Sequence, residues 1–393
     1  APDGSPADRP STSPTPESTL PSADDLLDVD DAKRLTPKGK WSVTATHDNT
    51  SGEGINYVCQ QQRFADPEGL ATLVRTLESS RGATRSVVQV VEISESAAAA
   101  SATYDTIASW FAGCEDGELQ LKQAYAVDGI AERAMLLELE SWDTPRSSYT
   151  VGVAEVGQVV TTTVVDTVNG RPPKRHLAAR TLAASSRMIC ERAGRSDCGG
   201  RPEVRPVPPD PSGQAPGILA TLDMPPMAGV SLPWVATQTE STRTNPAATR
   251  CDKAAFRRAG AVRSRTRTFF APPEARLPDQ FGLTETTGEF RDPRAAKAFL
   301  RAVRERMASC EERDLATEVE APRSLREGLL DGSTWRLRTE VSENRDVVFD
   351  VGFVRRGRHV AQLLFVPAGR ADLRPGDFRA LVIRAGERLR EVE

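Results

Sequence analysis

The decapeptide VGVAEVGQVV (151–160) is matched by VGFVRRGRHV (351–360), with glycine at the second and seventh place of each. Working outward, Trp41 and Trp234 lie 193 positions apart, and so do Trp142 and Trp335. Each pair of tryptophans encloses two cysteines, so the order Trp–Cys–Cys–Trp occurs twice. Rare residues that recur in one order indicate an internal duplication. The sequence therefore predicts two copies of one domain, at 32–200 and 222–393.

Secondary-structure patterns repeat in the same way. Residues 86–94 read as a strand, and residues 96–114 have the apolar spacing of a helix with one buried face. In the second copy Asp292 is a candidate N-cap with Pro293 at the first helical position. Three strands and a closing helix (180–192 and 378–391) follow in each copy. Consecutive strands with inserted helices predict an α+β fold, in which each copy has an antiparallel sheet packed by helices.

Six cysteines allow fifteen disulfide pairings. The repeat selects among them, because each copy has one early cysteine and one at the end of its helix. We therefore predict the bridges Cys59–Cys114 and Cys251–Cys310, with Cys190–Cys198 as the remaining pair. Disulfides persist in oxidising compartments, so this pattern predicts an exported protein of the cell envelope or extracellular space.

Proline-rich segments flank the copies. Residues 1–23 contain six prolines and one large apolar residue, and residues 1–31 are predicted to be a disordered tether. The stretch 201–216 contains six further prolines, which predicts a linker over 201–221. Because the chain begins APDGSPADRP, without methionine, we expect that a leader or anchor has been removed and that the N-terminal segment can act as a membrane tether.

Composition and motifs argue against several classes of function. The net charge is −4, which argues against nucleic acid as a partner, and no apolar run is long enough to span a membrane. No motif for a hydrolase, kinase, phosphate-binding loop or dinucleotide site occurs. His47, His176 and His359 are the only histidines, and neither His47 nor His359 has a counterpart in the other copy. We therefore predict no catalytic residues, no metal site and no cofactor.

Charge distinguishes the two copies. Residues 221–393 contain 30 Lys and Arg against 25 Asp and Glu, a net charge of +5, so the remainder carries −9. Arg263, Arg265 and Arg267 alternate along one predicted strand, and Arg336 and Arg338 alternate along another. A basic sheet face of this kind could hold a phosphorylated or carboxylated ligand, although a solvated face in an arginine-rich chain is the simpler explanation.

One copy resembles the PknH-like extracellular sensor domain. The resemblance is carried by the early cysteine, the strand leading into a helix that ends WFAGC (110–114), and the final three-strand meander. The second copy keeps the helix–cysteine ending, RMASC (306–310), without the tryptophan. That domain occurs outside the membrane on actinobacterial serine/threonine kinases and on secreted or lipid-anchored proteins. The resemblance implies a disulfide-bonded α+β domain with a cleft, which binds an unidentified ligand and has no catalysis of its own.

Together these observations predict a non-catalytic sensor or binding protein of the actinobacterial cell envelope, with a small-molecule or cell-wall ligand. Two alternatives remain. One is an exported cell-wall hydrolase that uses carboxylates not paired by any motif, and the other is a structural module that contacts a membrane partner. A cleft that brings two carboxylates within about 5–10 Å would favour the hydrolase.

Overall fold

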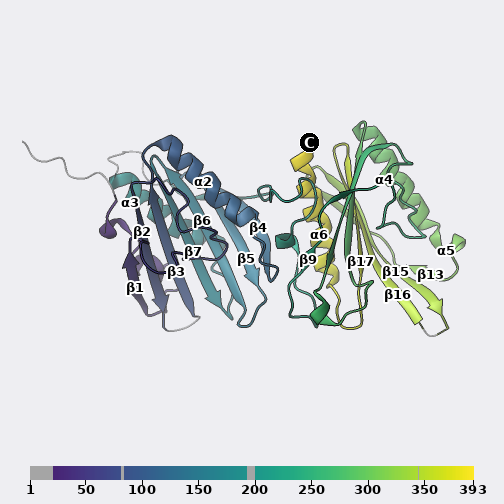
Figure 1. The fold of residues 1–393 in the computed structure, drawn as a ribbon, viewed down its shortest axis with the longest axis horizontal. Helices are drawn as coiled ribbons and strands as arrows, with labels where there is room; N and C mark the ends of the chain where they lie inside the picture. The colour runs from purple at the N-terminus through teal and green to yellow at the C-terminus, as the bar shows by residue number, and fades with distance from the viewer. Residues whose placement is uncertain (1–20, 81–83, 193–199, 344) are drawn as a thin grey trace, which may run out of the picture.

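The computed structural model of the chain describes residues 21–80, 84–192, 200–343 and 345–393. Two antiparallel sheets lie side by side, each packed by helices, so the fold class is α+β (Figure 1). The first sheet has the strand order β1-β2-β3-β7-β6-β5-β4-β8. Its strands are β1 (Trp41–His47), β2 (Ala71–Ser79), β3 (Arg85–Ile93), β4 (Leu119–Asp128), β5 (Arg133–Ser141), β6 (Ser147–Val156), β7 (Val159–Val168) and β8 (Glu203–Val207).

The second sheet has the order β10-β11-β12-β17-β16-β15-β13, with β9 paired to β11 and β14 paired to β15. Its strands are β9 (Val235–Ala236), β10 (Glu240–Ser241), β11 (Ala261–Phe270), β12 (Gly282–Phe290), β13 (Thr317–Val319), β14 (Arg323–Glu327), β15 (Leu330–Ser342), β16 (Arg345–Arg356) and β17 (His359–Val366). The central order β2-β3-β7-β6-β5-β4 thus corresponds to β11-β12-β17-β16-β15-β13. Both halves have the same topology, as a duplicated domain requires.

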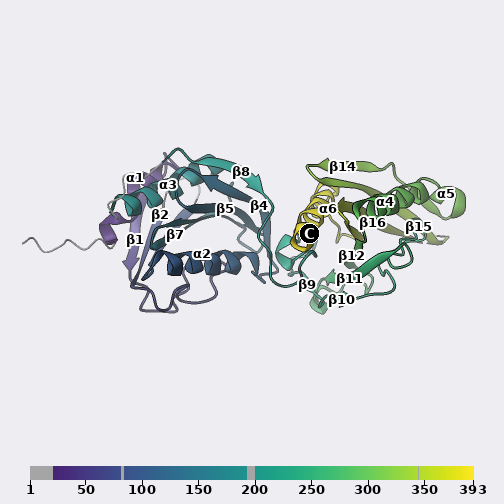
Figure 2. The ribbon, with the colours of Figure 1, turned by 90° about the horizontal axis from the view of Figure 1, so that it is seen from above.

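Each sheet is covered on both faces. In the first half α2 (Ala97–Ala112) packs on one face and α3 (Arg175–Arg192) on the other (Figure 2). In the second half α4 (Pro293–Ala308), followed by the short α5 (Cys310–Arg313), covers one face. The opposite face is covered by α6 (Pro375–Arg388), which continues as the 3₁₀ turn η4 (Leu389–Val392). Asp292 caps α4 as predicted, since its carboxylate accepts a 2.8 Å hydrogen bond from Ala295 N.

The repeated glycines have a packing role. Gly152 and Gly352 lie at matching places in β6 and β16, where the C-terminal helix of each half crosses the sheet. A Cβ at Gly152 would lie 3.1 Å from Leu182 Cδ2, and one at Gly352 would lie 2.3 Å from Val382 Cγ2. Glycine therefore allows close contact between helix and sheet. The second glycines, Gly157 and Gly357, have φ of 59° and 52° in the following hairpin turns, a conformation that favours glycine.

Two disulfides join corresponding parts of the two halves. Cys59–Cys114 and Cys251–Cys310 have Cα separations of 5.4 and 5.0 Å, and both are pairs that the repeat predicts. Each bridge ties the segment before β2 or β11 to the end of the helix on one face, α2 or α4. The predicted Cys190–Cys198 pair lies outside the described residues, because Cys198 does.

The predicted tether is too long. Residues 1–20 lie outside the described part of the chain, but the acidic stretch that follows is folded. It contains the 3₁₀ turn η1 (Ala23–Asp25) and the helix α1 (Val29–Lys33). Between them Leu26 and Leu27 are 2% and 1% exposed, because they pack against the first sheet and α3. These leucines, together with Ala32 and Leu35, anchor a segment that is otherwise acidic.

The predicted linker is also structured in part. Residues 203–207 form β8, which pairs with β4 at the edge of the first sheet, where Pro206 is tolerated. Further along, Leu219 lies in the core of the second half, and η2 (Thr221–Asp223) follows it. Leu219 N donates to Glu285 Oε2 at 2.8 Å, as Leu27 N donates to Gln89 Oε1 at 2.7 Å. The repeat therefore begins before residues 32 and 222.

Candidate functional site

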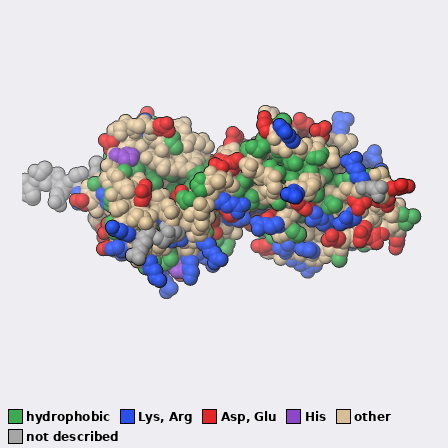
Figure 3. Space-filling model, turned by 90° about the horizontal axis from the view of Figure 1, so that it is seen from below, with side chains coloured by type: hydrophobic (Ala, Val, Ile, Leu, Met, Phe, Trp, Pro, Cys, Tyr) green, Lys and Arg blue, Asp and Glu red, His purple; other side chains and the backbone are tan. Residues whose placement is uncertain are grey.

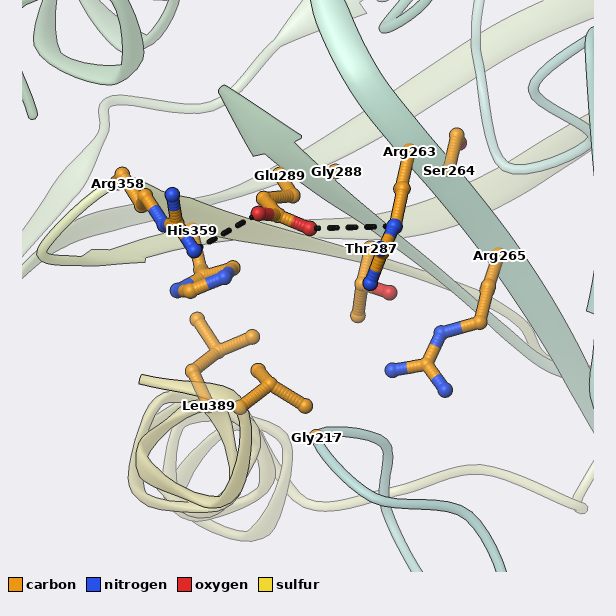
Figure 4. Close-up of a pocket in the computed structure, with 11 residues that line it drawn as sticks. Gly217, Arg263, Ser264, Arg265, Thr287, Gly288, Glu289, Arg358, His359 and Leu389 are labelled. Carbon is orange, nitrogen blue, oxygen red and sulfur yellow. Dashed lines mark ion pairs between the residues drawn. The ribbon is translucent and has the colours of Figure 1, made fainter. Parts of the chain in front are cut away.

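A polar cavity of about 230 Å³ lies on the α6 face of the second sheet, at one end of β11, β12 and β17 (Figure 4). The end of α6 with η4, together with the segment at Gly217, closes its other side. The residues that line it are Gly217, Arg263, Ser264, Arg265, Thr287, Gly288, Glu289, Arg358, His359, Leu389 and Val392. We call this cavity the arginine pocket.

Strand register places the polar side chains of the arginine pocket in rows. Arg263 on β11 pairs with Glu289 on β12, and Glu289 pairs with His359 on β17. Two residues along, Arg265 pairs with Thr287. Side chains of directly paired residues lie on the same face, so both rows project towards the end of α6. Arg358 lies in the turn before β17 and also lines the arginine pocket.

The arginine pocket has an excess of positive charge. Among the described residues that line it, Glu289 is the only carboxylate, and that carboxylate lies between two guanidinium groups. Its Oε1 is 2.9 Å from Arg358 Nη2, and its Oε2 is 3.8 Å from Arg263 Nε. Arg265 donates from Nη2 to Pro216 O at 2.5 Å. Three arginines against one glutamate leave two positive charges, an arrangement that attracts anions.

His359 is the most buried polar group in the arginine pocket. It is 3% exposed, and neither ring nitrogen has a hydrogen-bond partner within the described part of the chain. Burial lowers the pKa of His359, and the neighbouring charges of Glu289 and Arg358 act in opposite directions. The imidazole is therefore neutral at pH 7 and retains an unused donor and acceptor. Buried polar groups are rarely left without a partner, so His359 needs an explanation.

The wall of the arginine pocket opposite the strands is formed by the segment at Gly217 and by η4, which pack closely together. Gly217 has φ of 76°, and a Cβ there would lie 2.9 Å from Val392 Cγ2. Gly217 N donates to Glu391 Oε2 at 3.1 Å, which fixes the segment against η4. Leu389 and Val392 add an apolar surface beside the imidazole. The arginine pocket thus has charged side chains from the strands on one side and a small, mostly apolar wall on the other.

The five predicted ligand-binding arginines do not form one site. Only Arg263 and Arg265 line the arginine pocket. Arg267 is 8% exposed and donates to Leu219 O and Thr237 O, so it holds segments of the second half together. Its guanidinium is already occupied by main-chain carbonyls.

The remaining two arginines lie on β15, which three strands separate from β11. Arg336 is 2.9 Å from Asp372 and 3.7 Å from Asp350, and Arg338 is 3.5 Å from Asp346. Acidic and basic side chains are interspersed over the visible face of the second half (Figure 3). The five arginines therefore do not share one basic face, because strand order separates the two groups and carboxylates neutralise Arg336 and Arg338.

Sequence reasoning missed Glu289, Arg358 and His359 as site residues. His359 was noted, but it was assigned to a strand or surface because the first copy has no counterpart. The signal is in the aligned decapeptides: Arg356, Arg358 and His359 stand where the first copy has Val156, Gln158 and Val159. A position-by-position comparison of the two copies would have found this change.

No cluster of three or more potential metal-ligating side chains occurs among the described residues. Within those same residues, no helix is both long and apolar enough to cross a membrane.

Comparison with known proteins gives one similar structure. The extracellular domain of PknH from Mycobacterium tuberculosis matches 43% of this chain and 94% of its own chain, with 10% sequence identity and a TM-score of 0.33. No protein-family model matches the sequence. No curated protein matches it either.

Proposed function

We propose that this chain is a non-catalytic, extracytoplasmic binding protein, and that its second half binds an anionic ligand in the arginine pocket. The observation that carries the proposal is the convergence of Arg263, Arg265 and Arg358 on one small cavity that contains a single carboxylate. The two disulfides support a location outside the reducing cytoplasm. A phosphorylated or carboxylated envelope component fits this charge.

The hydrolase alternative gains no support from the arginine pocket. Glycoside hydrolysis needs two carboxylates across the substrate. Here Glu289 is the sole carboxylate, and both of its oxygens face guanidinium groups. Charge neutralisation of that kind favours a structural role for Glu289, which keeps Arg263 and Arg358 apart and oriented towards the cavity.

Anion binding can be tested with pyrophosphate and citrate as phosphorylated and carboxylated probes. We expect at least one of them to bind the wild-type chain and to raise its melting temperature. Arg263→Gln and Arg358→Gln should each weaken binding by about 10- to 100-fold, because a charge-assisted hydrogen bond contributes about 1.5–3 kcal/mol. Among the described residues each guanidinium pairs only with Glu289, and in each variant Glu289 keeps the other arginine, so both variants should fold normally.

Arg338→Gln is the matched control, because it removes the same charge from an ion pair that lies outside the arginine pocket. The control should bind as the wild type does. Absence of binding by both probes would refute the proposed function, and so would an equal loss in Arg338→Gln, which would show only a general effect of net charge.

A further inference from the structure

The arginine pocket has more free donors than a carboxylate can use. Beyond its ion pairs with Glu289, no hydrogen bond joins the Arg263 or Arg358 guanidinium to another described residue. Arg265 uses only Nη2, and Thr287 lies beside it on the same face. A tetrahedral oxyanion with three terminal oxygens can engage three guanidinium groups at once. The excess of two positive charges also matches a dianion better than a monoanion.

His359 can supply a second hydrogen-bond donor when its imidazole is protonated. Charged groups surround it from every neighbouring strand and from the C-terminus. These groups are Arg265 on β11, Glu289 on β12, Arg356 on β16, Arg358 before β17, and Glu393. Leu389 lies on the remaining side (Figure 4). An anion held by the arginines would add negative charge next to the imidazole and would favour its protonated form.

We propose that the arginine pocket binds the terminal phosphate of a phosphate monoester, and that His359 and this phosphate share one proton in the complex. The inference rests on the proposed function and narrows its ligand class. In the binding step, the dianion and one proton from solvent enter a pocket with a neutral imidazole. The proton then lies between an imidazole nitrogen and a phosphate oxygen, and no covalent bond is formed or broken.

The chemistry of the two groups makes this sharing effective. The second pKa of a phosphate monoester is about 6, and that of histidine is about 6.5, so a proton is held by either group at similar cost. Carboxylates have a pKa of about 4 and hold no proton at pH 7. A phosphodiester carries one charge and does not titrate in this range. Each of these groups brings a single negative charge and no titratable proton near pH 7, so each would favour protonation of His359 less than a phosphate dianion does.

Isothermal titration calorimetry with methyl phosphate tests the inference, with dimethyl phosphate as the diester control. Binding of the dianion with uptake of one proton predicts affinity about tenfold higher at pH 6 than at pH 8, by linkage. At pH 8, titrations in two buffers of different ionisation enthalpy should show uptake of close to one proton. Dimethyl phosphate should bind more weakly at both pH values.

His359→Gln is the informative variant, because glutamine keeps hydrogen-bonding capacity but does not titrate. We expect it to bind methyl phosphate without proton uptake, and no more tightly at pH 6 than at pH 8. A wild-type affinity that is independent of pH, or a His359→Gln variant that behaves as the wild type does, would overturn the inference and leave His359 as a packing residue. Binding of pyrophosphate or citrate would still uphold the proposed function in that case.

Discussion

One location differs sharply between the two halves of the molecule. Four matching positions surround the end of the sheet under the C-terminal helix. In the first half they are Ile93, Val156, Val159 and Ile189, and in the second they are Glu289, Arg356, His359 and Leu389. The first set belongs to an apolar cluster, to which Leu26 also contributes. In the second half the same place is the arginine pocket.

The difference shows which features belong to the fold and which belong to the site. Both halves keep the long-range disulfide, the glycine under the C-terminal helix and the main-chain bond from the leading segment. These shared features maintain the sheet and its helices. The strand topology is the same in both halves, but three apolar residues of the first half are charged or titratable in the second. Where the first half has a packed cluster, the second half therefore has a cavity.

The largest effect should come from the shared disulfides. In the chain-entropy model, a bridge closing a loop of 55 or 59 residues contributes about 4 kcal/mol. We therefore expect Cys59→Ala/Cys114→Ala and Cys251→Ala/Cys310→Ala to lower the free energy of unfolding by similar amounts. Urea denaturation would measure this. A loss confined to one double variant would contradict the structural equivalence of the two bridges.

A smaller effect should separate the two helix-crossing glycines. Alanine at Gly352 would place Cβ 2.3 Å from Val382 Cγ2, whereas at Gly152 the closest atom is Thr163 Oγ1 at 2.8 Å. Valine is β-branched and cannot move aside easily. Overpacking of this kind costs about 1–3 kcal/mol, and we expect Gly352→Ala to lie at the upper end and Gly152→Ala at the lower. Thermal melts of both variants would check the order, and the reverse order would show that α3 is the more rigidly seated helix.

Much of the fold could be predicted from sequence because rare residues mark the repeat. Tryptophans, cysteines and paired glycines recur at nearly constant spacing, and they identify the strands and helices between them. β4 was missed, since a register shift between Leu121 and Gln123 breaks its alternation. The leading segments were also missed, because composition averages over a stretch and hides two anchoring residues such as Leu26 and Leu27.

The site was only partly predictable. Alternation along β11 drew attention to Arg263 and Arg265, which line the arginine pocket. It could not show that Arg267, two residues further, is enclosed by the segment containing Leu219. Nor does sequence spacing reveal that three strands lie between β11 and β15. Partners across a sheet are set by strand order, which local patterns do not encode.

A second matched position carries a charge in only one half. Gln89 and Glu285 lie at equivalent places in β3 and β12, and both accept the main-chain bond from the leading segment. Gln89 Nε2 also donates to Ser185 Oγ at 2.6 Å, whereas Glu285 Oε1 has no partner among the described residues. Both side chains are fully buried.

The smallest effect that we predict is a gain of stability in Glu285→Gln, which places the first-half residue in the second half. Burial raises the pKa of Glu285 to about 8, and the hydrogen bond from Leu219 N only partly opposes this. The folded chain therefore binds the proton more tightly than the unfolded chain does, so Glu285 lowers stability as the pH rises from about 4.5 to 8. Glutamine does not titrate, so the variant should lose this decline and be more stable than the wild type at pH 9. Urea denaturation at pH 5.5, 7 and 9 would measure the difference.

The reciprocal variant Gln89→Glu is the control, and it should introduce a new loss of stability at high pH in the first half. Equal pH dependence in Glu285→Gln and the wild type would mean that Glu285 is ionised in the folded chain and stabilised by Arg267.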